Sequence, residues 1–351
     1  MKKRAYFLFF GNCVIVKGAN RSLLIDLQSS RYKAVPNLLV DILKENKVRT
    51  LEEIKSDNEH QYDEGIDTYI NFFLDDDWGF ITAKPEYFPN LSLEWDYPGL
   101  ISNSIIDIRS EIPDYLSDAL KELDTLGCEA VQFRLYGSIN PEVLSTINRY
   151  ISTLTFTYIE VFLKFDDNII HFIKANAHGF IRFRGFYFYN SPENKTVLLK
   201  DNAGTSLTTM RYQKEVMDIH SCGKVELAAF VPDLMLFTES QKHNTCLNRK
   251  ISIDINGEIK NCPSMLRSYG NIRDTTLIEA IEKAGFKELW YIHKDQIEIC
   301  KDCEFRHVCT DCRAFIEEPG NIYSKPAKCS YDPYTSTWGD ENLTNNPLYG
   351  R

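Results

Sequence analysis

CKDCEFRHVCTDC, residues 300–312, contains two C-x2-C pairs that are separated by five residues. The two thiolates of each pair can bind the same ion, because they are close neighbours in the chain. This stretch therefore predicts a metal site, and the rest of the sequence has to show which metal it binds and what the site serves.

Seven of the ten cysteines fall in one region of the chain. They are Cys246, Cys262, Cys300, Cys303, Cys309, Cys312 and Cys329, whereas Cys13, Cys128 and Cys222 are scattered. A zinc ribbon separates its two pairs by about 15–20 residues, which is longer than the gap of five residues found here. Seven thiolates also exceed the four that one zinc needs, and iron–sulfur clusters accept all-thiolate ligand sets. The pattern favours iron–sulfur clusters, with zinc as the alternative.

Composition and charge narrow the function. The 351 residues are 43% hydrophobic and 26% charged, with a net charge of −10, as expected for a globular protein and not for a nucleic-acid-binding one. Apolar runs stay shorter than the roughly 18 residues of a membrane helix. The basic and apolar start, MKKRAYFLFF, is interrupted at Gly11 and Asn12, so we expect a strand there and not a secretory signal. These features predict a cytoplasmic protein with no membrane partner, in which the thiols stay reduced.

The middle of the chain alternates between strand and helix patterns. Strands are predicted at residues 102–108, 130–137, 158–165 and 180–189, and helices at residues 114–127, 140–153 and 168–179. Alternation of this kind predicts an α/β fold with a parallel sheet, either open or barrel-like.

The first 85 residues predict a small α+β unit. Strands are expected at residues 22–28, 31–36 and 79–84, and helices at residues 36–46 and 66–78. Thr50 and Glu53 form a capping box that opens a further helix.

A hairpin is predicted in ISIDINGEIK, residues 251–260, because Asn256-Gly257 is a strong signal for a two-residue turn. Such a turn would place Cys262 opposite Ile251. Thr276 and Glu279 form a second capping box beyond the hairpin.

The cysteine pattern from Cys246 to Cys329 resembles the SPASM domain, a cluster-binding module of radical S-adenosylmethionine peptide maturases. That family has the pattern C-x(9–15)-G-x4-C, C-x2-C-x5-C-x3-C and a final C, and this chain departs from it with x2 before Cys312. The resemblance implies two 4Fe–4S clusters. The first would be bound by Cys246, Cys262 and Cys312, with Cys222 as a candidate fourth ligand. The second would be bound by Cys300, Cys303, Cys309 and Cys329.

The middle region resembles a partial (β/α) barrel of the radical S-adenosylmethionine type that has lost its radical site. That family binds the cofactor at a C-x3-C-x2-C motif after the first barrel strand, and this sequence has no cysteine from residue 14 to residue 127. We therefore expect no cofactor site for S-adenosylmethionine. The N-terminal part resembles a winged-helix precursor-recognition domain, to which a leader peptide adds a strand. The implied domains are residues 1–85, 86–240 and 241–351.

The whole chain resembles the SPASM protein of grasp-with-spasm systems. The matching stretches are KGANRSLLIDLQ, NTCLNRKISIDINGEIKNCPSM, CKDCEFRHVCTDCRAF and KCSYDPYTSTW. The resemblance implies a precursor peptide and an ATP-grasp ligase as partners in the maturation of a ribosomally synthesised peptide. Two alternatives stay open, a redox enzyme that modifies the peptide through a cluster and a zinc-stabilised peptide-binding scaffold. His243 and His307 are candidate ligands or hydrogen-bond donors to cluster sulfur.

Overall fold

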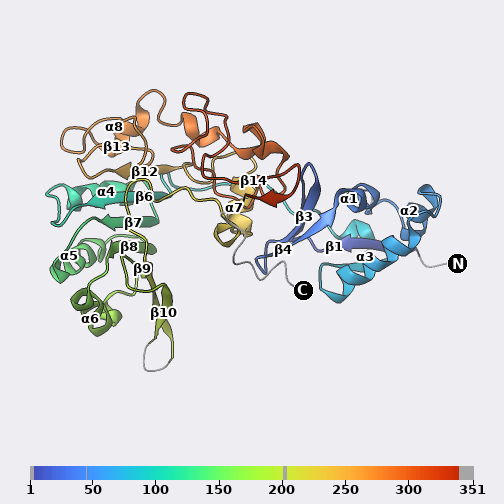
Figure 1. Ribbon diagram of the computed structural model, residues 1–351, viewed down its shortest axis with the longest axis horizontal. Coiled ribbons are helices and arrows are strands. Elements are labelled where there is room, and N and C mark those ends of the chain that lie inside the picture. Colours follow the sequence, from blue (N-terminus) through green and yellow to red (C-terminus); the bar gives the residue numbers. More distant parts are fainter. Residues whose placement is uncertain (1–3, 45, 201–203, 340–351) are drawn as a thin grey trace. The chain divides into compact units, whose positions relative to one another are not determined.

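Strand and helix alternate along the middle of the chain in the computed structural model, which describes residues 4–44, 46–200 and 204–339 (Figure 1). The strands are β6 (Asn103–Ile108), β7 (Ala130–Leu135), β8 (Tyr158–Lys164) and β9 (Phe183–Tyr189). The helices between them are α4 (Leu116–Thr125), α5 (Pro141–Ile151) and α6 (Asp167–Ala175). Neighbouring strands of this series pair in parallel, which confirms the predicted parallel sheet.

Four further strands complete an eight-stranded sheet. They are β10 (Lys195–Lys200), β11 (Ser206–Tyr212), β12 (Lys250–Ile253) and β13 (Ile259–Lys260). The order is β10-β11-β9-β8-β7-β6-β12-β13, and only the two outermost strands pair antiparallel to their neighbours. Strand β12, which follows Cys246, therefore extends the same sheet as the middle region.

A large apolar core lies between this sheet and its helices. Alternate residues of the strands, such as Ile106, Phe133 and Val161, are fully buried, and they pack with Leu120 and Ile147 of the helices. Helices α4, α5 and α6 lie along the same side of the strands (Figure 1). Side chains that alternate along a strand and recur every three to four residues on a helix give two apolar faces that can cover each other.

The described chain divides into two compact units. The unit that we call the sheet unit comprises Tyr97–Gly223 and Cys246–Tyr291. The unit that we call the cysteine-rich unit comprises Met1–Asp96, Lys224–Thr245 and Ile292–Arg351. The three-domain division expected from the sequence stays a prediction.

The N-terminal part of the cysteine-rich unit has two small antiparallel sheets and three helices. Strand β1 (Tyr6–Phe9) pairs with β5 (Gly79–Thr82), and β2 (Cys13–Lys17), β3 (Arg21–Asp26) and β4 (Arg31–Pro36) form a second sheet. The helices are α1 (Asn37–Leu43), α2 (Leu51–Asp57) and α3 (Asp63–Asp75). The capping box of Thr50 and Glu53 is present at the start of α2, as predicted.

The sheet of β2, β3 and β4 shares a core with residues 292–338, which we call the cysteine segment. Val16, Leu23 and Ile25 pack in one cluster with Phe305 and Trp338. An ion pair of 2.6 Å between Arg21 Nε and Glu304 Oε1 joins the same two segments. Residues 1–85 therefore bury part of their apolar surface against a segment that follows them by more than 200 residues.

The cysteine segment has little regular secondary structure. It contains the 3-10 helices η5 (Lys294–Gln296) and η6 (Cys300–Asp302) and the short strands β14 (Tyr331–Asp332) and β15 (Thr337–Trp338). Helix α7 (Leu234–Glu239) precedes it in the same unit. In the sheet unit, helix α8 (Leu277–Glu282) begins at the predicted capping box of Thr276 and Glu279. None of the helices in the described part of the chain has the length and apolar character needed to cross a membrane.

The hairpin between β12 and β13 forms, but its predicted register is wrong. Ile253 faces Ile259 and Ser252 faces Lys260, so Cys262 is one residue out of the predicted position opposite Ile251. The turn has three residues because only Gly257 has a left-handed backbone, with a φ of +84°, whereas the predicted two-residue turn needs a positive φ at both positions. Asp254 stabilises the turn by accepting hydrogen bonds from the backbone N–H groups of residues 256 and 258.

Candidate metal centre

Four of the predicted ligands lie together in the cysteine-rich unit. Cys300 opens η6, Cys303 follows this helix, and Cys309 and Cys329 come from later turns. The four thiols are close enough to influence one another's pKa values. In addition to burial, the charge of Cys329 raises the pKa of both Cys300 and Cys309, and the charge of Cys309 raises that of Cys303. Burial raises the pKa of Cys309 to about 12, so this thiol stays protonated at neutral pH unless a cation stabilises its thiolate.

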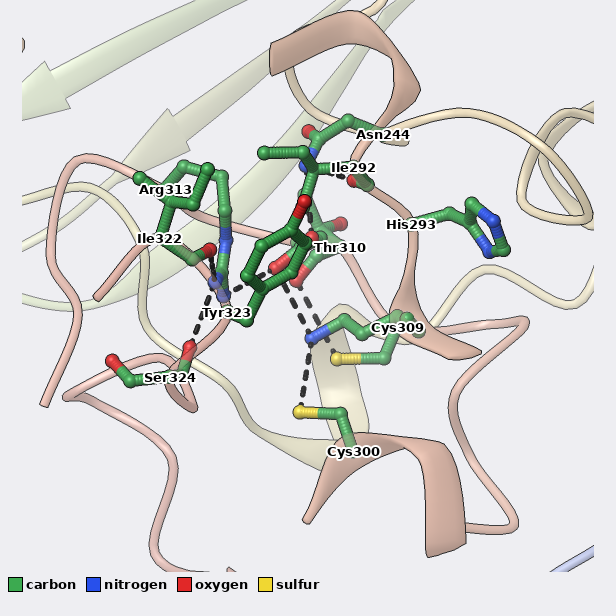
Figure 2. Close-up of polar contacts among 12 residues, drawn as sticks. Asn244, Ile292, His293, Cys300, Cys309, Thr310, Arg313, Ile322, Tyr323 and Ser324 are labelled. Atoms are coloured by element: carbon green, nitrogen blue, oxygen red, sulfur yellow. Dashed lines mark hydrogen bonds and ion pairs between the residues drawn. The ribbon is translucent and has the colours of Figure 1, made fainter. Parts of the chain in front are cut away.

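Three charged side chains lie buried beside these thiols. Lys294 Nζ is 3.8 Å from Cys300 Sγ and 3.5 Å from Asp311 Oδ1, and Arg313 Nη2 is 2.7 Å from the same oxygen. Figure 2 shows Cys300 and Cys309 pointing toward this group of contacts. Burial by itself would lower the pKa of Lys294, but Cys309 and Cys300 in their thiolate forms, together with the carboxylate of Asp311, raise it well above its usual value. The ion pair with Asp311 therefore places an ammonium group beside these sulfurs.

A second group of thiols lies in the sheet unit. Cys222 hydrogen-bonds to Cys262, and this bond, burial and the charge of Cys246 raise the pKa of Cys262. Lys250 Nζ is 3.8 Å from Cys246 Sγ, and Cys222 Sγ is 3.4 Å from Ser264 Oγ. The structure thus places Cys222, the candidate fourth ligand, beside two of the predicted ligands of the first cluster. The third, Cys312, is buried in the cysteine-rich unit.

The thiol groups suit a cluster by the chemistry of their donors. All ten cysteines lie outside disulfides. Among the described residues, no three His, Cys, Asp or Glu side chains are close enough together to hold one metal ion. The donors in both groups are sulfurs, the ligands that iron–sulfur clusters take, and each group has a lysine ammonium to balance thiolate charge. The chemistry of the donors, and not a geometry preformed for a single ion, therefore fits an iron–sulfur cluster.

The two candidate histidines lie near the cysteines in sequence and contact other groups. His307 Nδ1 is 2.9 Å from Ser240 Oγ, and burial together with Arg306 lowers the pKa of His307 to about 4, which keeps the ring neutral. The ring of His243 lies 5.3 Å from that of Trp95. A role for either histidine toward cluster sulfur stays a prediction.

The buried charges are the site residues that the sequence did not reveal. Lys294 and Lys250 occupy positions with no spacing rule, six residues before Cys300 and four after Cys246. In the sheet unit, Arg134 binds Asp107 through two hydrogen bonds of 2.6 and 2.7 Å at the carboxyl ends of β7 and β6. In the sequence, this pair is indicated only by a charged residue inside each of two otherwise largely apolar strands.

An apolar cavity of about 860 Å³ opens in the cysteine-rich unit. Its walls include Phe9 of β1, Ile15 of β2, Phe80 of β5 and Phe88, with Arg306 of the cysteine segment as a polar neighbour. Strand β2 pairs with β3 and is the last strand on its side of the sheet. The cavity therefore adjoins both a sheet edge and the loop that connects Cys303 with Cys309.

Residues 245–304 match the SPASM family, described as an iron–sulfur cluster-binding domain. The matched segment contains Cys246, Cys262, Cys300 and Cys303, which confirms the SPASM resemblance over this part of the chain. Two solved structures are similar at 9% sequence identity, each over 92% of this chain and 99% of its own. They are crystal structures of Streptococcus suis SuiB, with a TM-score of 0.41, and of Streptococcus suis SuiB bound to S-adenosylmethionine, with a TM-score of 0.39. Among curated proteins, none matches this sequence.

Proposed function

We propose that this protein takes part in the maturation of a ribosomally synthesised peptide, as the cluster-carrying partner of an ATP-grasp ligase. The observation that supports the proposal most is the match of residues 245–304 to an iron–sulfur cluster-binding family, together with the two groups of thiols. In this role the protein binds the precursor peptide and presents it to the ligase. It works in the cytoplasm, without nucleic acid or membrane as partner.

Two 4Fe–4S clusters are proposed, in the arrangement that the sequence predicts. Cys300, Cys303, Cys309 and Cys329 would bind one cluster, and Cys246, Cys262 and Cys312 would bind the other, with Cys222 as its fourth ligand. A bound cluster supplies a rigid cross-link between the loops that carry its ligands and can accept one electron. Zinc in the same thiolates would supply only the cross-link.

The precursor peptide is proposed to bind at the winged-helix-like N-terminal part. An extended peptide can add to the edge of a sheet and place alternate side chains in a pocket. Strand β2 offers such an edge, and the apolar cavity beside Ile15 offers such a pocket. This geometry supports leader-peptide binding in the region of residues 1–85.

Cleavage of S-adenosylmethionine is not part of the proposed function. The sequence has no cysteine between residues 14 and 127, where the ligands of the cleaving cluster would be expected. In this chain the carboxyl ends of β6 and β7 carry the buried pair of Asp107 and Arg134. A redox enzyme that acts on the peptide through a cluster is the second candidate. It is favoured by the position of Cys222 beside Cys262, because a group of the substrate could replace Cys222 as the fourth ligand.

Metal analysis tests the cluster proposal directly. Protein purified without oxygen is expected to contain about eight irons with equal sulfide, if two 4Fe–4S clusters are bound. Electron paramagnetic resonance of the dithionite-reduced sample should show their signals. Zinc with little iron would contradict the cluster proposal and support a zinc-stabilised scaffold. Formation of 5′-deoxyadenosine from S-adenosylmethionine under reducing conditions would contradict the proposed loss of the radical site.

Titration of the full-length chain tests the peptide site. The probe is a fluorescently labelled precursor peptide of the proposed maturation system. Ile15→Arg introduces a charge into the cavity and is expected to weaken binding at least about tenfold, about 1.4 kcal/mol. Val48→Arg, an exposed position in the same unit, is the matched control and should bind like the unmodified chain. Equal affinity of both variants would contradict the proposed site.

A further inference from the structure

Lys294, Asp311 and Arg313 form a buried group with an unbalanced charge. Their exposed fractions are 3%, 1% and 5%, and their formal charges sum to +1. A charged group removed from water requires a nearby partner of opposite charge, because burial without one is very unfavourable. The group therefore needs one more negative charge close by.

Asp311 is held mainly by other partners. Its Oδ1 lies 2.7 Å from Arg313 Nη2, and its Oδ2 accepts a hydrogen bond of 2.8 Å from Asn244. Arg313 is fixed in turn, since it donates to the backbone oxygens of Ile322 and Ser324 at 3.1 and 2.7 Å (Figure 2). Lys294 is farther from Asp311, at 3.5 Å. The carboxylate is thus shared between two cations, and the lysine charge stays incompletely balanced.

The remaining negative charge can come from the thiols at Lys294. Its Nζ lies 3.8 Å from Cys300 Sγ. Neutral thiols would leave the lysine charge unbalanced, whereas metal-bound thiolates would balance it. Lys250 at Cys246 repeats the arrangement in the sheet unit, at the same N–S distance of 3.8 Å.

We propose that Lys294 is a positioning residue for the redox state of the cluster bound by Cys300, Cys303, Cys309 and Cys329. Its fixed positive charge stabilises the more negative, reduced state over the oxidised state and so raises the reduction potential. Arg313 and Asn244 keep Asp311 from cancelling that charge. The inference rests on the proposed function, in which these thiolates bind an iron–sulfur cluster.

The test is a redox titration of the full chain, purified without oxygen and followed by electron paramagnetic resonance. Dithionite supplies the single electron, and the signal followed is the one that Cys303→Ser abolishes. Lys294→Met removes the charge and keeps the length of the side chain. At the potential where the unmodified protein is half reduced, the reduced-to-oxidised ratio of Lys294→Met is expected to be at least about tenfold lower. This corresponds to a reduction potential lower by about 59 mV for a one-electron couple.

Two further variants sharpen the test. Asp311→Asn removes the negative charge between the cations and should shift the ratio in the opposite direction. Lys301 follows Cys300 in sequence but is exposed. Lys301→Met is therefore the matched control and should have the same reduction potential as the unmodified protein. A Lys294→Met titration equal to that of Lys301→Met would overturn the proposal.

Loss of iron is also informative. If Lys294→Met loses the iron of this site and Lys294→Arg retains it, the positive charge is required and the proposal is supported. If both variants lose it, the lysine acts through packing and the proposal is overturned. Absence of iron from the unmodified protein would be a failure of the proposed function itself, and the metal content of that sample distinguishes the two failures.

Discussion

The sheet unit and the cysteine segment of the cysteine-rich unit are stabilised in different ways. The sheet unit has eight paired strands and a continuous apolar core. Residues 292–338 have only 3-10 turns and two strands of two residues each, and they bury several charges. An apolar core contributes stability without any ligand, whereas buried charges and thiols need balancing partners. We therefore expect residues 292–338 to depend more strongly on bound metal than strands β6 to β9 do.

Removal of metal is expected to give the largest difference in stability between the two regions. After chelation of iron under oxidising conditions, residues 292–338 are expected to lose more than about 5 kcal/mol of local unfolding free energy, because metal binding in small thiolate sites is worth about 10–16 kcal/mol. Strands β6 to β9 should keep their protection. Hydrogen exchange with mass spectrometry measures both regions in one sample. Unchanged protection of residues 292–338 would remove the basis of the comparison.

The buried pair of Arg134 and Asp107 tests whether the sheet unit also depends on charge balance. Arg134→Met should lower the free energy of unfolding by about 3–5 kcal/mol, because it leaves a buried carboxylate without its partner. The double variant with Asp107→Leu should recover most of this loss. Urea denaturation measures all variants.

A matched control for this pair is exposed Arg273, which lies 2.7 Å from Asp114. Arg273→Met is expected to change the free energy of unfolding by about 0–1 kcal/mol. If Arg134→Met is no more destabilising than Arg273→Met, the buried pair contributes nothing particular to the sheet unit.

Asp26 gives a smaller expected effect than the buried Arg134–Asp107 pair, and a pH dependence for the N-terminal sheet of the cysteine-rich unit. Burial alone would raise the pKa of Asp26, but hydrogen bonds from Ser29, Gln28 and Asn12 lower it to about 2. Because the pKa is lower in the folded state, the stabilisation is fully present above about pH 4 and is lost as the pH falls toward 2. It amounts to about 2 kcal/mol.

Acid denaturation followed by circular dichroism checks this effect. Asp26→Asn should lower stability at pH 6 and flatten the decrease between pH 4 and pH 2. A variant whose stability falls as steeply as that of the unmodified chain would show that the hydrogen bonds of Asp26 do not couple to folding.

Local patterns made much of the fold predictable. The alternation of strand and helix from β6 to β9 and the capping boxes at Thr50 and Thr276 are formed by residues close in sequence, and the structure confirms them. The hairpin register failed because the turn type depends on which residue adopts a left-handed backbone, and Asn256-Gly257 is compatible with more than one turn.

Pairings between distant segments could not be predicted. Strand β12 joins β6 across more than 140 residues, and Phe305 completes the core of the N-terminal sheet. Such contacts depend on the complementarity of whole surfaces, which a single sequence does not display. For the same reason the cavity at Ile15 has no counterpart in the sequence pattern.

The sequence by itself determined the secondary-structure pattern, the thiol ligands to consider and the resemblance of Cys246–Cys329 to a SPASM domain, because periodicity and cysteine spacing are local properties. The family match covers residues 245–304 of that stretch. Only the tertiary structure decided which thiols lie together, that Cys222 joins Cys262, and that Lys294 is buried at Cys300. From the sequence alone, a lysine is expected at the surface. Its environment, and with it its effect on a thiolate, is set by segments that fold around it from elsewhere in the chain.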